Sequence, residues 1–131
     1  MGRRKYVLIV DDCQQDRMAV ADVLRSDYDI LEACNGKQAL EILSKKRAQI
    51  SLIMLDLMMP VMGGLEAARQ IRAMELPEAK QVPIIPMTAQ SSEESKEGCR
   101  AAGMNSHLTK PIEPDSLVQT ILETAEHAFG K

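Results

Sequence analysis

The segment Leu52-Ile53-Met54-Leu55-Asp56 decides the fold, because an apolar run without polar alternation ends there on a carboxylate. The segment Val7-Leu8-Ile9-Val10 is a second run of this kind, and Asp11-Asp12 follows it at once. Unalternating apolar runs are typical of strands buried on both faces, as in a parallel sheet covered by helices. The two segments therefore predict buried strands of a parallel sheet.

Three further apolar runs complete a set of five expected strands, over 6–10, 28–33, 50–55, 82–87 and 106–109. Helical patterns follow the strands. Their apolar faces are assigned to Met18, Ala21 and Leu24, to Ala39, Leu40 and Leu43, to Leu65, Ala68 and Ile71, and to Val118, Ile121, Leu122 and Ala125. Strict alternation of strands and helices predicts a doubly wound five-stranded parallel sheet of the α/β class, with helices on both faces.

Two segments depart from this regular pattern. The fourth expected helix, over 92–102, has a polar centre that contains Gly98, and its apolar side chains are few and small. We expect it to be weakly anchored and to be the element that moves. Pro86 lies in the fourth strand, where it removes an amide donor, so a local irregularity in pairing is expected there.

Length and composition place limits on the function. The 131 residues fit one domain, expected over 1–131 with a core at about 5–128 and no output domain. A net charge of −3 and 2% aromatic residues argue against a nucleic-acid surface. An odd set of three cysteines without metal-ligand spacing, and the lack of a long apolar stretch, indicate a cytoplasmic domain with no membrane contact.

Polar side chains stand at the ends of four of the expected strands. Asp11-Asp12 follows the first, Asp56 the third, Thr88 the fourth and Lys110 the fifth. Ligands of such sheets bind beyond the carboxyl ends of the strands. Three converging carboxylates imply a bound cation, and oxygen-only ligands favour Mg²⁺. With a hydroxyl and an ammonium, they make a set suited to phosphoryl transfer.

Four motifs make the chain similar to a known family over essentially its whole length. They are Ile9-Val10-Asp11-Asp12, then Leu55-Asp56-Leu57-Met58-Met59-Pro60-Val61-Met62-Gly63-Gly64, Met87-Thr88-Ala89, and Lys110-Pro111. In this order the chain resembles the receiver domain of two-component response regulators. The resemblance implies a flavodoxin-like (βα)5 fold with strand order 2-1-3-4-5, an architecture for which a chemotaxis member of this family is a standard example.

The resemblance also implies roles for individual residues. Asp56 is the expected phosphoacceptor, and the expected Mg²⁺ ligands are Asp12, Asp56 and the backbone carbonyl of Met58, with Asp11 acting through water. The expected phosphoryl-binding and switch residues are Thr88, the backbone of Ala89, Lys110 and His107. Met58 and Gln90 flank the expected path of the attacking water and would tune dephosphorylation, and the bond before Pro111 is expected to be cis.

The implied signalling reaction has a definite partner. The phosphodonor is a phosphohistidine on a histidine kinase or a histidine phosphotransfer domain. Phosphorylation would switch a surface on the fourth helix, fifth strand and fifth helix, with a phosphorylation-dependent homodimer left open. The chain would not be an enzyme in the usual sense, although it would catalyse its own phosphorylation and dephosphorylation. The segment 103–112 is more similar to receivers attached to hybrid histidine kinases than to those fused to DNA-binding domains.

Other interpretations remain open beside this one. His107 stands where many family members carry Tyr or Phe, and it is either a polar side chain at a strand edge or a gate. A degenerate receiver that acts as a protein-interaction module would lack Asp56, the acidic pair or Lys110, all of which are present. A phosphohydrolase with an Asp nucleophile would need a second acid at position 58, where the chain has Met.

Overall fold

A computed structural model describes residues 6–46, 50–59, 61–75, 77–89, 92–110 and 112–128. The strands are β1 (Tyr6–Val10), β2 (Asp29–Ala33), β3 (Ile50–Asp56), β4 (Ile84–Thr88) and β5 (Leu108–Thr109). The helices are α1 (Gln14–Leu24), α2 (Gly36–Lys46), α3 (Gly64–Ala73), α4 (Pro77–Gln81), α5 (Glu93–Ala101) and α6 (Pro114–Ala128).

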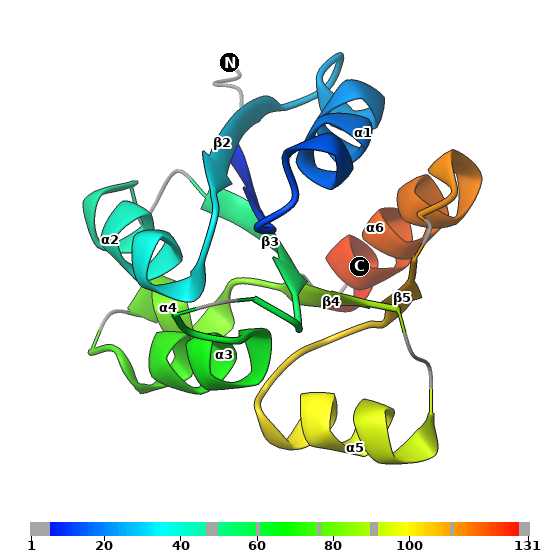
Figure 1. Cartoon of the computed structure of the whole chain (residues 1–131). Helices are drawn as coiled ribbons and strands as arrows, with labels where there is room; N and C mark the ends of the chain where they lie inside the picture. Colours follow the sequence, from blue (N-terminus) through cyan, green and yellow to red (C-terminus); the bar gives the residue numbers. More distant parts are fainter. Residues whose placement is uncertain are drawn as a thin grey trace.

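The strands form one parallel sheet in the order β2-β1-β3-β4-β5, which confirms the predicted topology. Figure 1 shows the sheet running through the middle of the molecule, with helices on either side. The order reverses at β1, because β2 lies on one side of it and β3 on the other. The carboxyl ends of β1 and β3 therefore meet beside a switch in strand order, where such sheets bind ligands.

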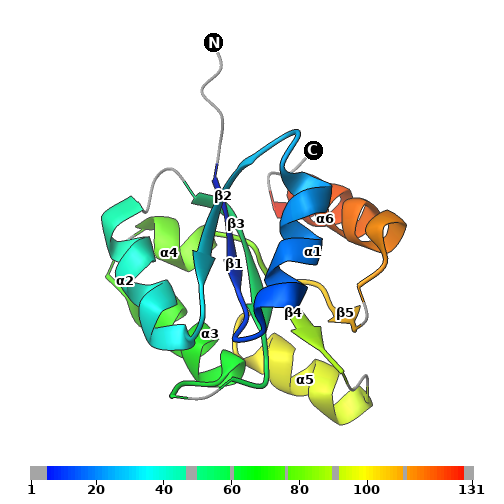
Figure 2. The ribbon, with the colours of Figure 1, turned by 45° about the horizontal axis from the view of Figure 1, so that its top comes forward.

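Each face of the sheet has its own hydrophobic core. Leu8 and Val10 of β1 point to the core under α2, α3, α4 and α5, whereas Val7 and Ile9 point to the core under α1 and α6. Figure 2 shows α1 and α6 together on one side of the sheet. Because both faces of β1 and β3 are buried, these central strands are apolar at nearly every position, which is the pattern seen in the sequence.

Two of the assigned helix faces were wrong in part. Met18, Val118 and Leu122 are 49%, 43% and 61% exposed. The residues that face the sheet are instead Val20, Ala21 and Leu24 in α1, and Leu117, Ile121 and Thr124 in α6. When apolar residues lie on both sides of the buried face of a helix, helical spacing alone does not tell which of the neighbouring apolar positions face the core.

A short helix, α4, was missed by the sequence prediction. It spans Pro77–Gln81 and its Ala79 is fully buried. Proline at the first helical position was the available signal, since its missing amide donor has no partner there in any case. Because of this helix, the fourth and fifth expected helices correspond to α5 and α6.

The weak anchorage of α5 is confirmed. Cys99 is its buried residue within Glu93–Ala101, and its N-cap is Ser92, whose side chain accepts a hydrogen bond from the Ser95 amide. A short polar helix is stabilised mainly by its cap and by the few contacts that it buries. Whether α5 moves stays a prediction.

The irregularity expected at Pro86 lies on one side of β4. Pairing with β3 runs through Pro86 in register with Leu55, but pairing with β5 begins only at Met87. On the β5 side, the carbonyls of Ile84 and Thr88 accept from the Asn105 and Lys110 amides, at 2.8 and 2.7 Å. Alternate residues of a strand face the same neighbour, so the missing amide of Pro86 faces β5, where the ladder is short.

The Arg72 guanidinium ties several segments together. Its Nε donates to the Gly103 carbonyl at 2.9 Å, Nη1 to the Ala79 carbonyl at 3.0 Å and Nη2 to Asn105 Oδ1 at 3.3 Å. The Ile84 amide donates to the same Asn105 oxygen at 2.8 Å. Arg72 of α3 therefore fixes α4 and the chain between α5 and β5.

Within the described residues, no helix has the length and apolarity needed to cross a bilayer.

Candidate functional site

Three carboxylates gather at the carboxyl ends of β1 and β3. Each of Asp11, Asp12 and Asp56 has an oxygen within 4.8 Å of an oxygen of the other two. Asp11 and Asp56 are buried, whereas Asp12 is exposed. The sequence prediction that these residues converge is confirmed, and the cluster opens to solvent on the side of Asp12.

The Lys110 ammonium joins this cluster from the end of β5. Its Nζ donates to Asp11 Oδ2 at 2.9 Å and lies 3.4 Å from Asp56 Oδ2. Burial lowers the pKa of Lys110, but its hydrogen bonds to Asp11 and Asp16 outweigh this effect and raise the pKa above its ordinary value. Lys110 is therefore a fixed positive charge among the carboxylates.

The environment of Asp56 disfavours its ionised form. Burial and the negative charge of Asp11 raise the pKa of Asp56 to about 6, against the opposing effects of Lys110 and of the Met58 amide, which donates to Asp56 Oδ1 at 3.3 Å. One ammonium does not compensate three neighbouring carboxylates. The cluster would be relieved by a further cation.

The donor set fits Mg²⁺. The converging atoms are carboxylate oxygens, which suit a hard cation, and the exposure of Asp12 leaves room for the water ligands that Mg²⁺ retains. Asp11, Asp12 and Asp56 are the residues that would hold it. The role proposed for the Met58 carbonyl stays a prediction.

Thr88 closes the site on the β4 side. It is the last residue of β4, it is 5% exposed, and its carbonyl accepts a hydrogen bond from the Lys110 amide at 2.7 Å. Met87 pairs with Asp56 across the ladder, so Thr88 stands one residue beyond the phosphoacceptor candidate on the adjacent strand. Ala89 follows in an exposed bend.

The chain after Asp56 is held close to the site by a tight approach of α3. The Gly64 amide donates to the Leu57 carbonyl at 3.0 Å, and Gly63 is the N-cap of α3. A Cβ at Gly64 would lie 2.4 Å from the Asp56 carbonyl oxygen. Only glycine fits this approach. Val61, in the same loop, has φ +69°, a left-handed conformation that is strained for a β-branched residue.

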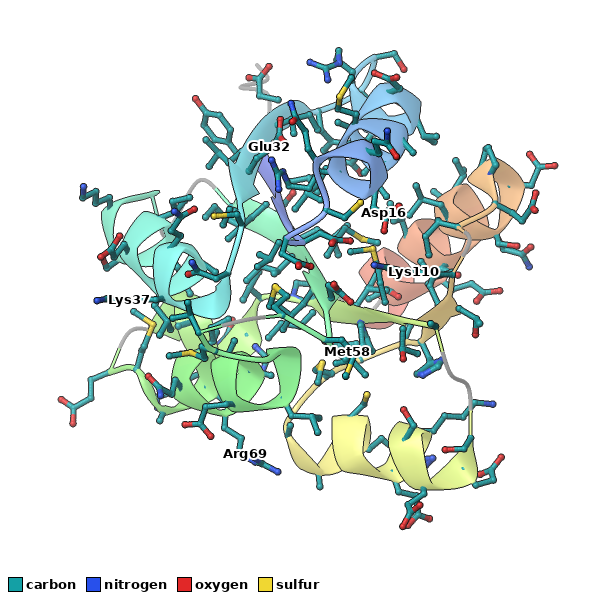
Figure 3. The ribbon with its side chains drawn as sticks, in the orientation of Figure 1. Asp16, Glu32, Lys37, Met58, Arg69 and Lys110 are labelled. Carbon is teal, nitrogen blue, oxygen red and sulfur yellow. The ribbon has the colours of Figure 1, made fainter. Side chains whose placement is uncertain are left out.

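Two side chains at the site were missed by the sequence prediction. Asp16, in the first turn of α1, accepts a hydrogen bond from Lys110 Nζ at 3.0 Å (Figure 3). Arg17 donates from Nη1 to the Asp11 carbonyl at 2.6 Å and from Nε to Glu32 Oε1 at 2.8 Å. Their place one turn after Asp11-Asp12 was the available signal, since the first turn of α1 starts at the edge that carries the site.

His107 lies apart from the acidic cluster. It lines a cavity of about 240 Å³ between α5 and the segment before β5, together with Lys96, Cys99, Arg100, Met104, Asn105 and Ser106. Among the described residues, its Nε2 is the buried side-chain nitrogen without a hydrogen-bond partner. Burial and Lys96 lower the pKa of His107.

Gln90 and Pro111, which were assigned roles from the sequence, lie outside the described residues.

The topology and the acidic edge together define a flavodoxin-like α/β protein. The chain belongs to the response regulator receiver domain family, whose sequence profile matches residues 7–122. It is 34% identical over 119 residues to hybrid signal transduction histidine kinase I of Dictyostelium discoideum. That similarity covers 88% of this chain but spans only 7% of the length of the kinase.

Two solved structures are similar over nearly their whole length. The chemotaxis protein CheY4 of Vibrio cholerae has a TM-score of 0.86 and 32% identity, covering 93% of this chain and 99% of that one. The receiver domain of sensor histidine kinase PA1611 from Pseudomonas aeruginosa has a TM-score of 0.83 and 31% identity, covering 94% and 98%. In that second structure a magnesium ion is coordinated in the active site cleft.

Proposed function

We propose that this domain accepts a phosphoryl group on Asp56 from a phosphohistidine in a two-component phosphorelay, with Mg²⁺ bound by Asp12, Asp56 and the Met58 carbonyl, and by Asp11 through water. The observation that carries the proposal is the convergence of these three carboxylates within 4.8 Å, with the Lys110 ammonium among them. The magnesium ion seen in the PA1611 receiver supports the choice of metal.

In the transfer step, an Asp56 carboxylate oxygen attacks the phosphorus atom. The O–P bond forms as the P–N bond to the donor imidazole breaks, and the imidazole leaves with the electron pair and takes up a proton. Mg²⁺, when bound, neutralises charge on the phosphoryl oxygens. Lys110 pairs with a phosphoryl oxygen, and the Thr88 hydroxyl and Ala89 amide donate to the others. Little beyond positioning and charge neutralisation is required.

The proposal also covers the phosphodonor, the surface that responds to phosphorylation and the cellular location of the domain. The donor is a histidine kinase or a histidine phosphotransfer domain, and the similarity to hybrid signal transduction histidine kinase I supports a kinase-type partner. The surface that responds comprises α5, β5 and α6, and a phosphorylation-dependent homodimer is one form that the response would take. We place this domain in the cytoplasm, without nucleic-acid or membrane contacts of its own.

The test is incubation with Mg²⁺ and acetyl phosphate, followed by measurement of intact mass. One added phosphoryl group is expected, and Asp56→Ala should abolish it. Asp22→Ala is the matched control, because Asp22 is an exposed carboxylate on α1 whose partner is Arg25 at 3.7 Å. No mass gain while a control receiver is modified would favour a degenerate receiver that acts as an interaction module. Multiple turnovers of a phosphate ester would favour a phosphohydrolase.

The lifetime of the phosphoryl group tests the two flanking positions. Gln90→Ala should change the lifetime more than Met58→Ala, because an amide side chain can orient water and a thioether cannot. The Met58 side chain is 76% exposed, and the contact of this residue with Asp56 is a hydrogen bond from its backbone amide. Equal lifetimes in the two variants would contradict this assignment.

A further inference from the structure

Lys110 contacts three carboxylates that come from three different elements. Its Nζ lies 2.9 Å from Asp11 Oδ2, 3.0 Å from Asp16 Oδ2 and 3.4 Å from Asp56 Oδ2. The first follows β1, the second belongs to α1 and the third ends β3. Asp16 lies outside the metal-binding cluster of Asp11, Asp12 and Asp56.

The short contacts hold the ammonium toward α1. Distances of 2.9 and 3.0 Å are hydrogen bonds between charged groups, whereas 3.4 Å to Asp56 is longer than such bonds. An ammonium has three donors, and two of them are directed at Asp11 and Asp16. In this arrangement Asp56 has the weakest hold on Lys110 of the three carboxylates.

The three carboxylates differ in how easily they can release Lys110. The side chains of Asp11 and Asp56 are 1% and 5% exposed, but that of Asp16 is 46% exposed. Water can therefore replace the ammonium at Asp16, while it reaches the other two far less readily. Of the three contacts, the one to Asp16 is therefore the least costly for Lys110 to break.

We propose that Asp16 is a positioning residue that holds Lys110 on the α1 side of the unphosphorylated site and so weakens the pairing of Lys110 with a phosphoryl group on Asp56. This inference rests on the proposed function. Asp16 would thereby set the balance between the unmodified and the phosphorylated arrangement without touching phosphate or metal.

Two simpler roles for Asp16 need to be separated from this one. A carboxylate in the first turn of a helix stabilises that helix through its dipole, and this would alter stability alone. A negative charge near the site also repels any incoming anion, whichever residue carries it. Glu32 provides the comparison for the second role, because its side chain is 41% exposed and it contacts Arg17 instead of Lys110.

The probe is beryllofluoride, a non-covalent mimic of the phosphoryl group, titrated in saturating Mg²⁺ by calorimetry. Asp16→Asn should tighten its binding about two- to fivefold, the range expected for the loss of one partly exposed ion pair. Asp16→Glu should remain near wild type because it keeps the carboxylate. Glu32→Gln should leave the affinity unchanged. Thermal unfolding of each variant checks that all are folded.

Each other outcome overturns the inference. Unchanged affinity in Asp16→Asn would mean that the contact with Lys110 is incidental, and an equal gain in Glu32→Gln would mean that only the general charge matters. If wild type binds beryllofluoride and is phosphorylated while Asp16→Asn behaves identically, the inference alone fails. If wild type neither binds the mimic nor gains a phosphoryl group, the proposed function fails as well.

Discussion

The acidic edge at β1 and β3 and the region around α5 and β5 are built in opposite ways. At the acidic edge, buried carboxylates crowd one another, Lys110 donates to the Asp11 carboxylate, and Arg17 donates to the Asp11 carbonyl. Around α5, one buried side chain anchors the helix, and the His107 ring faces a cavity with Nε2 unpartnered. The carboxylates lie where the chain is closely packed, and the region next to them is lightly held.

Changing Gly64 should break the crowded region and give the largest effect. Gly64→Ala would bring Cβ to 2.4 Å from the Asp56 carbonyl oxygen, so the backbone must shift. We expect a loss of at least about 2 kcal/mol in the free energy of unfolding, measured by denaturant titration. Gly63→Ala is the control, because its Cβ would approach the Leu57 carbonyl at 3.3 Å and should cost less. Equal losses would refute the steric account.

Removing the charge of Asp56 should relieve the crowding. Folding raises the pKa of Asp56 from 3.8 to about 6. At pH 7 the carboxylate is ionised in both the folded and the unfolded protein, so its burial lowers the free energy of unfolding. Asp56→Asn should raise the stability of the Mg²⁺-free protein at pH 7 by about 1–2 kcal/mol.

The gain should disappear as the pH falls from 6 to below 3.8, where Asp56 is protonated both folded and unfolded. Urea titrations of both proteins across this range give the measurement. Added Mg²⁺ should also shrink the difference, because it stabilises wild type. A gain that persisted undiminished at low pH would show that charge is not the cause.

Strengthening α5 tests the lightly held region. Gly98 is a helical residue, and a Cβ there would have no atom within 4 Å. Gly98→Ala should therefore stabilise the protein by about 0.5–1 kcal/mol. Gly103→Ala is the opposite control, because Gly103 has φ +89° and a Cβ would meet Arg72 Cγ at 2.9 Å. Hydrogen exchange of α5 amides should slow in Gly98→Ala, and unchanged protection would indicate that helix propensity does not limit α5.

The smallest expected effect concerns His107. Its pKa lies below 6.5 because of burial and Lys96, so the unfolded state takes up the proton more readily and stability falls as the pH drops below 6.5. His107→Phe should remove this pH dependence. The loss of stability that it removes is less than about 1 kcal/mol, because the ring is partly exposed. Unfolding at pH 5 and pH 7 measures it, with His127→Gln as the control. The same pH dependence in His107→Phe would show that the His107 imidazole is not its cause.

The fold and the identity of the site were predictable because they depend on local patterns. Unalternating apolar strands that end on Asp11-Asp12 and Asp56 define both the parallel sheet and the edge where the carboxylates meet. Lys110 could be placed for the same reason, since it directly follows β5. Parallel strands bring their carboxyl ends to one edge whatever the details of packing.

What could not be predicted depends on side-chain direction and tertiary contact. Met18 was assigned to the buried face of α1 although it is 49% exposed, because the sequence does not say how the helix is rotated. The contact of Asp16 with Lys110 joins residues far apart in the chain and follows from that same rotation. The unpartnered Nε2 of His107 likewise depends on how α5 lies against the segment before β5.

The two-residue length of β5 also bears on how the protein behaves at high concentration. β5 is an edge strand of the sheet, and an exposed edge can pair with the edge of another molecule. Leu108–Thr109 offers very little backbone for such pairing. The shortness that leaves β5 lightly attached to β4 therefore also protects the open side of the sheet from aggregation.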